Sequence, residues 1–471
     1  GSSEAYSPDD EESMKQRVIE LLEGGLTADE AVQICLLNNP SLHARFLEIG
    51  MARADVVQAG LFSNPSLGLA LRLPAGGGLA NIDAGIAQNI ADLWQIPARR
   101  RAAERSLDQT ILQIARGAAD LAADAKRAYY TTAGTRQLYD IAQENLLITK
   151  ELLELAVTRQ QAGAGNVIDV NLARSQMVEA ELVQELTRLA AADAGRTLAT
   201  LLGLAIESDT LVLVDSLPDI PPEPLDSESL VSIARQWRLD LRAAEQAVAA
   251  AEARLQEQYR LIIPEFEFGV AFERDARQQQ GGRKLLADTA RASIAGGGLT
   301  APDIEPRSQR QRNKRTDFVI GPSIGLELPI FDQNQAQIAK ARFAYTQAIK
   351  NLEALDLVAT QQIRGAVDRA RTRWRIIRLY RDHTLPLAKD NLDLSRKSYR
   401  AGKTSFLSVI EAQKFFLDSR KRYVEASRDA AVTIPELERA IGLPFDLLMS
   451  TPSVENETGR RDVEPEDNTE P

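Results

Sequence analysis

Hydrophobic and polar positions follow two different periods along the chain, and both periods occur in each half. Residues 99–159 are rich in Ala, Leu, Gln, Glu and Arg, which are strong helix formers, and no proline occurs between Ala98 and Asp215. A continuous helix of that length would span roughly 90 Å at about 1.5 Å per residue, and such lengths are typical of coiled-coil packing. By contrast, Ser66–Leu73 alternates strictly between apolar and small or polar residues, which predicts a half-buried strand.

The same alternation predicts four strands, two in each half. Residues 66–90 form a hairpin around the glycines at 76–78, and the second half supplies strands at about 265–273 and 318–328. One face of each strand is apolar, and the opposite face carries Ser, Gly, Glu and Arg. The apolar residues are Leu67, Leu69, Leu71, Leu73, Phe266, Phe268, Val270, Phe272, Phe318, Ile320, Ile324, Leu326 and Leu328.

The chain is an internal duplication. The stretch around Gly163 recurs around Gly402, 239 residues later, and Leu42 recurs as Leu241, 199 residues later. We expect an N-terminal arm (1–25), a first repeat (26–216, tip about 159–169), a linker (217–224), a second repeat (225–450, tip about 399–408) and a disordered tail (451–471). Within this plan a helix capped by Thr27 or Asp29 is expected to run past Pro40 to about residue 60. Return helices are expected at 167–202 and 406–441, and the long helix 336–398 should bend near Pro386.

Composition narrows the function. The net charge of -11 argues against a nucleic-acid partner, and a single cysteine, Cys35, permits no internal disulfide. No apolar run approaches the length of a membrane-crossing helix, a test that does not detect membrane strands. The two histidines, His43 and His383, lie in unrelated settings, and no metal or nucleophile motif occurs. We therefore expect neither an enzyme nor a cofactor or metal site.

Four strands with one apolar face cannot close a barrel alone, and an open edge cannot lie in lipid. Either the sheet packs as a soluble patch on other elements, or several chains pool their strands. Three chains would form a twelve-stranded barrel with an apolar exterior and a polar lumen. Trp94 and Phe331, each just past a strand, would then suit an interfacial aromatic girdle.

The sequence resembles the TolC-like family of outer-membrane efflux proteins from about Leu26 to Leu443. The resemblance depends on an ordered, duplicated set of short segments, none of them specific alone. Two of these segments, Ala59–Leu67 and Leu328–Ala336, are most similar to the branch of the family that serves heavy-metal resistance pumps. The set comprises Leu26–Val32, Asn38–Leu42, both glycine-centred tips, Ala59–Leu67 and Leu328–Ala336.

The resemblance implies a mainly α fold with a membrane β-barrel. Duplicated helical hairpins would form a trimeric α-barrel tunnel, and four strands per chain would enter a shared twelve-stranded barrel. Such a homotrimer lies in the outer membrane, in contact with its lipid, and extends into the periplasm. There it meets a periplasmic adaptor and an inner-membrane transporter, which we expect to be of the RND type. Family members are often lipid-anchored. The Gly-Ser-Ser start resembles an expression remnant, so we expect a native signal or lipid segment to have been removed.

The resemblance also assigns roles at the tips. Asp169 matches an acidic position at the tunnel entrance, Tyr399 an aromatic of the gate's hydrogen-bond network, and Glu411 a second acidic position. Thr404 stands where an arginine is expected, and Lys403 is the substitute cation; Ser408 stands where an acid is usual. Gly163, Gly165 and Gly402 form the adaptor-docking tip.

Each role has a simpler alternative. Asp169 suits the N-terminus of a returning helix by charge alone, Glu411 suits a solvated helix face, and Tyr399 suits packing at a helix end. The loop 274–317 carries ten basic and five acidic residues, which fits either contact with lipopolysaccharide phosphates or plain solvation.

Three functions stay open at this point. The first is a passive efflux duct for small molecules or metal ions, with rings of Asp169 and Glu411 favouring cations. The others are a type I protein secretion duct and a soluble coiled-coil scaffold, and cargo is chosen by the inner-membrane partner rather than by this chain.

Overall fold

The computed structural model describes residues 8–73, 79–163, 165–205, 211–218, 226–264, 266–276, 294–296, 316–445 and 447. The chain divides into two compact units. Unit 1 comprises Gly1–Ala52, Leu107–Val248 and Ala348–Pro471, and unit 2 comprises Arg53–Ser106 and Ala249–Gln347. The tail at 451–471, most of the loop 274–317 and most of the linker 217–224 lie outside the described residues.

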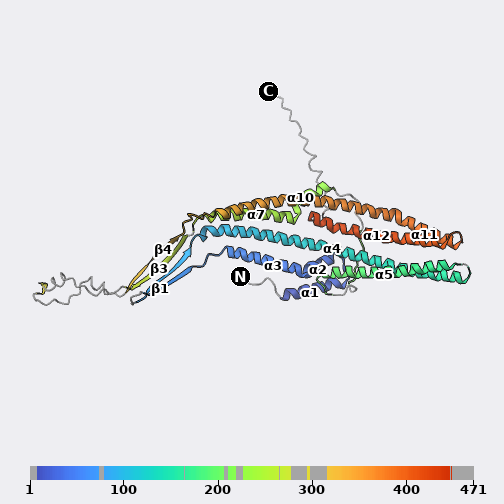
Figure 1. Cartoon of the computed structure of the whole chain (residues 1–471), viewed down its shortest axis with the longest axis horizontal. Coiled ribbons are helices and arrows are strands. Elements are labelled where there is room, and N and C mark those ends of the chain that lie inside the picture. Colours follow the sequence, from blue (N-terminus) through green and yellow to red (C-terminus); the bar gives the residue numbers. More distant parts are fainter. Residues whose placement is uncertain are drawn as a thin grey trace, which may run out of the picture. The chain divides into compact units, whose positions relative to one another are not determined.

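Long helices dominate the described chain (Figure 1). The expected return helices are confirmed as α5 (Val167–Leu201) and α12 (Phe406–Ile441). None of the helices in the described part of the chain combines the length and the apolar character that crossing a membrane requires. The other helices are α1 (Pro8–Glu23), α2 (Ala28–Asn38), α3 (Pro40–Ala59), α4 (Asp92–Gln161), α6 (Ser227–Trp237), α7 (Leu239–Arg260), α10 (Gln335–Leu379) and α11 (Leu385–Arg400).

The single helix expected from Thr27 past Pro40 is wrong: the structure has two helices, α2 and α3. Thr27 and Glu30 form a reciprocal capping box that starts α2. Asn39 ends it in an extended conformation, with φ −76° and ψ 116°, because a residue before proline is disfavoured in the helical region. Its side-chain oxygen then accepts hydrogen bonds from the backbone N–H groups of Ser41 (2.9 Å) and Leu42 (3.2 Å), which fixes the start of α3.

Unit 1 contains two equivalent hydrophobic cores. The first gathers residues of α1, α2, α4 and α5, and the second gathers residues of α6, α10 and α12. α2 and α6 have the same length and lie 199 residues apart, so buried Cys35 of the first core corresponds to buried Ala234 of the second. Burial raises the pKa of the Cys35 thiol to about 11, and its Sγ lies 3.1 Å from the carbonyl oxygen of Leu201. Cys35 is therefore an unreactive core residue, as expected.

The second long helix is interrupted where the sequence predicted a bend. A π-helical turn at Tyr380–Thr384 separates α10 from α11, directly before Pro386. α4, by contrast, is continuous over 70 residues although it includes Pro97.

Unit 2 holds one antiparallel sheet of four strands in the order β1-β2-β3-β4 (Figure 1). The strands are β1 (Ser66–Arg72), β2 (Asn81–Asn89), β3 (Phe266–Ala276) and β4 (Thr316–Leu326). The two hairpins of the duplicated halves meet where β2 pairs with β3. All four strands predicted from the alternation are thus confirmed, and the structure adds their order.

The register aligns the apolar positions of all four strands. Leu69 pairs with Ala84, Ala84 with Phe272, and Phe272 with Ile320. One residue along each strand, Gly68, Gly85, Ala271 and Gly321 form the corresponding row of the opposite face. The members of this row on the edge strands are solvent-exposed in the single chain, with Leu69 at 74% and Ile320 at 71% exposure, and the two members on the central strands are half-buried.

A buried carboxylate holds the first strand to the helix that follows the hairpin. Asp92, at the start of α4, accepts hydrogen bonds from the backbone N–H (2.7 Å) and hydroxyl (2.6 Å) of Ser63. Arg99, two turns later, donates to the carbonyl oxygens of Ala59 (2.9 Å) and Leu61 (2.8 Å). The end of α3 and the entry to β1 are therefore fixed by α4.

Candidate functional site: the hairpin tips

The two helical hairpins reverse direction with the same backbone arrangement. Gly163 follows α4 with φ +73°, and Gly402 follows α11 with φ +72°, a region that favours glycine. At the second tip the N–H of Gly402 bonds to the carbonyl of Tyr399 (3.0 Å), and the N–H of Lys403 bonds to that of Ser398 (2.9 Å). This pair of bonds is a Schellman motif, so the glycine stops predicted from sequence are helix C-caps.

Each returning helix begins with a polar N-cap. Asn166 accepts a hydrogen bond from the N–H of Ile168 (3.2 Å), and Ser405 accepts one from the N–H of Ser408 (3.4 Å). Gly165 serves a separate purpose, because a Cβ at this position would lie only 2.8 Å from the backbone nitrogen of Gln160. The first tip is therefore closely folded back onto the end of α4.

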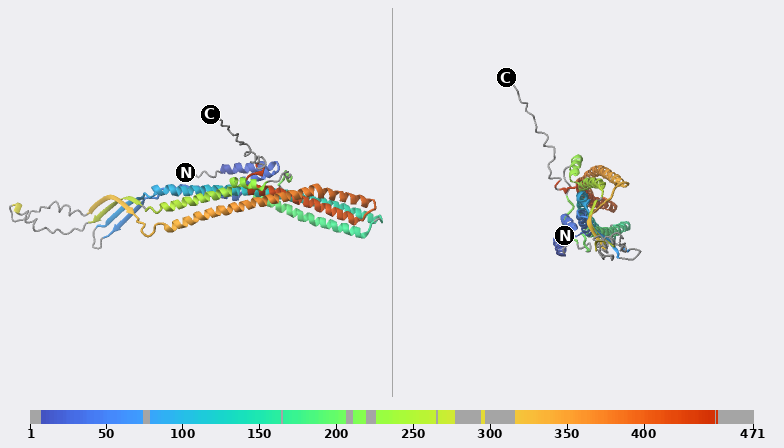
Figure 2. Two further views of the ribbon diagram at one scale, coloured as in Figure 1. Left: turned by 90° about the horizontal axis from the view of Figure 1, so that it is seen from above. Right: turned by 90° about the vertical axis from the view of Figure 1, so that its left-hand side faces the viewer.

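The two tips pack against each other (Figures 1 and 2). A small hydrophobic cluster joins buried residues of α4 and α5 to buried residues of α12, with Tyr399 of α11 at its margin. Residues more than 200 positions apart in the sequence therefore form one site. The buried members are Ala156, Val170, Ala173, Phe406 and Ile410.

Tyr399, in α11 of the second hairpin, contacts residues of both hairpins. Its ring centroid is 5.5 Å from that of Phe406, and the guanidinium carbon of Arg159 lies 4.4 Å from the Tyr399 centroid. Burial raises the pKa of Tyr399, the positive charge of Arg159 opposes this rise, and the negative charge of Asp169 adds to it. The structure thus places Tyr399 beside a cation, Arg159, that the sequence reading missed, and close enough to Asp169 for the negative charge to act on the Tyr399 hydroxyl.

The remaining predicted gate residues are more exposed. Lys403 and Glu411 are exposed and Thr404 is half-buried, and none of the three belongs to the hydrophobic cluster described at the tips. Asp169 occupies the first turn of α5, where its charge also favours the helix N-terminus, so its two interpretations are compatible. Ser408, at the equivalent position of α12, bonds instead to the hydroxyl of Ser405 (3.1 Å).

The sequence does suggest a role for Arg159, but a different one. An arginine in the last turn of a helix ordinarily complements the helix dipole. Nothing in the sequence indicates that the next helical hairpin places an aromatic ring beneath it.

The two expected girdle residues differ in exposure. Phe331 is 92% exposed, whereas Trp94 is half-buried and its carbonyl accepts a hydrogen bond from Arg260 (3.0 Å). Their role at a membrane interface stays a prediction.

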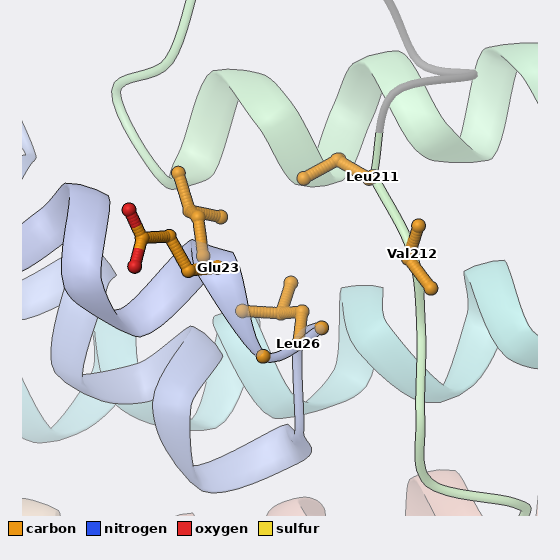
Figure 3. Close-up of a pocket in the computed structure, with 7 residues that line it drawn as sticks. Glu23, Leu26, Leu211 and Val212 are labelled. Atoms are coloured by element: carbon orange, nitrogen blue, oxygen red, sulfur yellow. The ribbon is translucent and has the colours of Figure 1, made fainter.

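A pocket of about 400 Å³ lies beside the bridge between Leu26 and Leu213, away from the tips. Its wall consists of backbone and aliphatic side chains, and Figure 3 shows the carboxylate of Glu23 turned away from Leu211 and Val212. Among the residues with described placement, no group of three or more His, Cys, Asp or Glu could hold a metal ion. The pocket thus offers little chemistry, and the tips are the candidate site.

A family comparison agrees with the duplicated fold. The model of the family described as outer membrane efflux protein matches residues 31–204 and 230–443. The chain therefore belongs to the outer membrane efflux protein family.

Individual relatives are more distant. The chain is 24% identical to the pyoverdine export outer membrane protein OpmQ of Pseudomonas putida, over 75% of this chain and 67% of the relative. It is 25% identical to protein CyaE of Bordetella pertussis, over 84% of this chain and 79% of the relative. Among solved structures, the outer membrane protein VceC of Vibrio cholerae superposes with a TM-score of 0.66 at 17% identity, over 89% of this chain and 96% of that one.

The fold and the family together define an outer-membrane channel protein of bacterial efflux systems. The narrower assignment to the heavy-metal resistance branch stays a prediction.

Proposed function

We propose that three copies of this chain form the outer-membrane duct of a tripartite efflux pump and conduct cargo passively. The observation that carries the proposal is the sheet. Its apolar rows run in register across all four strands and are exposed, and both edge strands, β1 and β4, pair on one side only within the described chain. Open edges are unfavourable in lipid, whereas three sheets joined edge to edge close into a twelve-stranded barrel with the apolar face outward.

The return helix supports the same assembly. α5 carries exposed apolar residues at helical spacing, an arrangement that is typical of a face covered by another helix. In a single chain this stripe has no cover among the described residues, and a neighbouring copy would supply it. The residues are Val178 (46% exposed), Leu182 (57%), Leu186 (67%) and Leu189 (55%).

In this duct the packed tips form the periplasmic gate. Tyr399 and Asp169 lie at its closed end, Glu411, Lys403 and Thr404 line its approach, and Gly163, Gly165 and Gly402 mark where the adaptor docks. An inner-membrane transporter, of the RND type, supplies the energy and selects the cargo. The chain itself has no catalytic role and requires no cofactor, and Trp94 and Phe331 anchor the barrel at the lipid interface.

The cargo is best described as a small molecule. The relative OpmQ is named as a pyoverdine export protein, which favours a small-molecule cargo over a secreted protein. Three copies of Asp169 around the entrance would favour cations over anions.

The proposal is tested with the full-length protein in detergent and in planar lipid bilayers. We expect a particle of three times the chain mass of 51.7 kDa, and small, cation-selective currents after insertion. A monomer that is stable without detergent and never inserts into bilayers would instead favour the soluble scaffold.

A further inference from the structure

The side-chain hydroxyl of Tyr399 has no hydrogen-bond partner among the described residues, although its ring is closely contacted on two sides. Phe406 approaches at a tilt of 50°, and Arg159 covers the ring with its guanidinium group. We propose that Arg159 is a positioning residue of the gate, which holds the second hairpin tip against the first through a cation–π contact with Tyr399. This role rests on the proposed duct.

The contact adds a polar link between two hairpins that also pack through the hydrophobic cluster at the tips. Arg159 lies in the last turn of α4, and Tyr399 lies in the last turn of α11, so each belongs to a different hairpin. The separation of 4.4 Å is well inside the distance of about 6 Å at which a cation is attracted by an aromatic face. The contact can exist only while the two tips remain side by side.

The surroundings suit arginine. Arg159 is half-buried, and its planar, weakly hydrated guanidinium stacks on a ring more favourably than the ammonium of lysine. The negative charge of Asp169, on the first turn of α5, acts at the same ring and balances the local charge. The ends of α4 and α11 therefore meet in a stacked pair of cation and ring, on which the charge of Asp169 acts.

A gate held closed by the ring face of Tyr399 differs from one held closed by the Tyr399 hydroxyl group. The two arrangements predict opposite results for Tyr399→Phe. If the ring face is what matters, Tyr399→Phe keeps the gate closed, because it retains the aromatic surface. Tyr399→Leu and Arg159→Gln both open it. A hydroxyl lock would respond to Tyr399→Phe as strongly as to Tyr399→Leu.

The chain supplies a matched control for the charge. Arg400 lies at the same tip, is exposed, and contacts no aromatic ring among the described residues. Arg400→Gln removes the same unit charge as Arg159→Gln without removing a stack, so a purely electrostatic effect would appear in both variants.

The experiment measures the open probability of the full-length protein in planar bilayers. We expect Arg159→Gln and Tyr399→Leu each to raise it by at least about two- to fivefold, the factor given by the loss of one partly exposed cation–π contact in a trimer that has three. The double variant should exceed neither single variant, and Arg159→Lys should fall between wild type and Arg159→Gln. Unchanged thermal unfolding midpoints would show that the helices themselves are intact.

The outcomes separate the two proposals. A wild type that conducts, with Arg159→Gln behaving like Arg400→Gln or with additive effects in the double variant, overturns the role of Arg159 and leaves the duct. Opening by Tyr399→Phe equal to that by Tyr399→Leu overturns it as well. A wild type that never conducts overturns the duct, and with it this role.

Discussion

The two helical hairpins of the duplication differ by one residue. The return helices α5 and α12 correspond at a constant separation of 239 residues, as buried Leu198 and Leu437 illustrate. The helices that lead to the tips, α4 in the first hairpin and α10 with α11 in the second, do not keep a constant separation. Their buried residues lie 238 apart before the π turn and 239 apart after it, so the second hairpin contains one extra residue there. The pairs are Ala125 and Ile363, Tyr129 and Val367, Thr132 and Ala370 before the turn, and Thr149 and Ala388 after it.

The π turn at Tyr380–Thr384 accommodates this residue locally. A π turn widens one turn of the helix, so the residues on either side keep their facing and the tip keeps its register. Pro386 follows directly, where its missing N–H is tolerated because the regular hydrogen-bond ladder is already interrupted. The comparison shows that the ends of the hairpin are more strictly constrained than its middle.

The two repeats also use different chemistry for one equivalent bond. Asn39 donates from Nδ2 to the carbonyl of Leu201 (2.8 Å), and Arg238 donates from Nη1 to the carbonyl of Ala440 (2.9 Å). Asn39 and Arg238 occupy the same repeat position, and both follow a short helix. Asn39 is neutral and therefore needs no counter-charge. Arg238 is charged and only 1% exposed, and it forms an ion pair with Asp240 at 2.6 Å.

Single-residue deletions test the extra residue most directly. Removing Asp382 from the π turn should restore a regular helix and cost about 1 kcal/mol. Removing Gln143, the equivalent exposed residue of continuous α4, rotates every following residue by about 100° and should cost about 5 kcal/mol or abolish folding. Denaturant unfolding of the full-length protein measures both, and equal costs would contradict the π-turn interpretation.

The hydrogen bond from charged Arg238 should contribute more to stability than the equivalent bond from neutral Asn39. Arg238→Met leaves Asp240 half-buried without its partner and should lower the free energy of unfolding by about 4 kcal/mol. Asn39→Ala should cost about 1.5 kcal/mol. Arg235→Gln, which breaks an exposed pair with Asp356, is the matched control and should change stability by less than about 1 kcal/mol. A loss for Asn39→Ala as large as that for Arg238→Met would show that charge is irrelevant here.

Glycines with the same backbone conformation should differ in their tolerance of alanine. Gly163 (φ +73°) has open space around a built Cβ, so Gly163→Ala should cost only the backbone strain of about 1 kcal/mol. Gly203 (φ +68°) ends α5, and a Cβ there collides with the carbonyl oxygen of Asn38, so Gly203→Ala should cost about 3 kcal/mol. Thermal unfolding compares the two, with Gly402→Ala expected to match Gly163→Ala.

Acid sensitivity should be the smallest difference between the repeats. Burial alone would raise the pKa of Asp240, but the hydrogen bonds and charge of Arg238 outweigh it and lower that pKa. A carboxyl group with a lowered folded-state pKa stabilises the protein above its unfolded pKa of about 3.9, and this contribution is lost as the pH falls further. We therefore expect unfolding midpoints to fall below about pH 4, and Asp240→Asn to reduce that fall. An identical acid profile in Asp240→Asn would contradict the assignment.

Much of the fold could be predicted because its signals are local. Glycine stops, N-caps and a proline-free composition define the helices within a few residues, and strict alternation defines the strands and their apolar face. Repetition of these signals identified the duplication. At Asn39 two local signals conflict: Pro40 disfavours a helical conformation at the residue before it, whereas the apolar pattern continues across the break and predicts a single helix.

The candidate site was only partly predictable. Asp169 and Tyr399 are both predicted from the sequence, and the charge of Asp169 acts on Tyr399 in the structure. The gate roles of these two residues and of Lys403, Thr404 and Glu411 stay predictions. The contact of Arg159 could not be predicted, because Tyr399, whose ring it covers, lies 240 residues later in the sequence.

The sequence by itself determined the strands, most of the helix ends, the duplication and the apolar face of each strand. These properties depend on neighbours within a few residues, whose backbone preferences and hydrogen bonds act over one turn or one strand pair. Only the tertiary structure decided that β2 pairs with β3, that Arg238 is buried against Ala440, and that Arg159 covers Tyr399. Such contacts depend on the packing of distant elements, and no local preference specifies which side chain a folded neighbour will present.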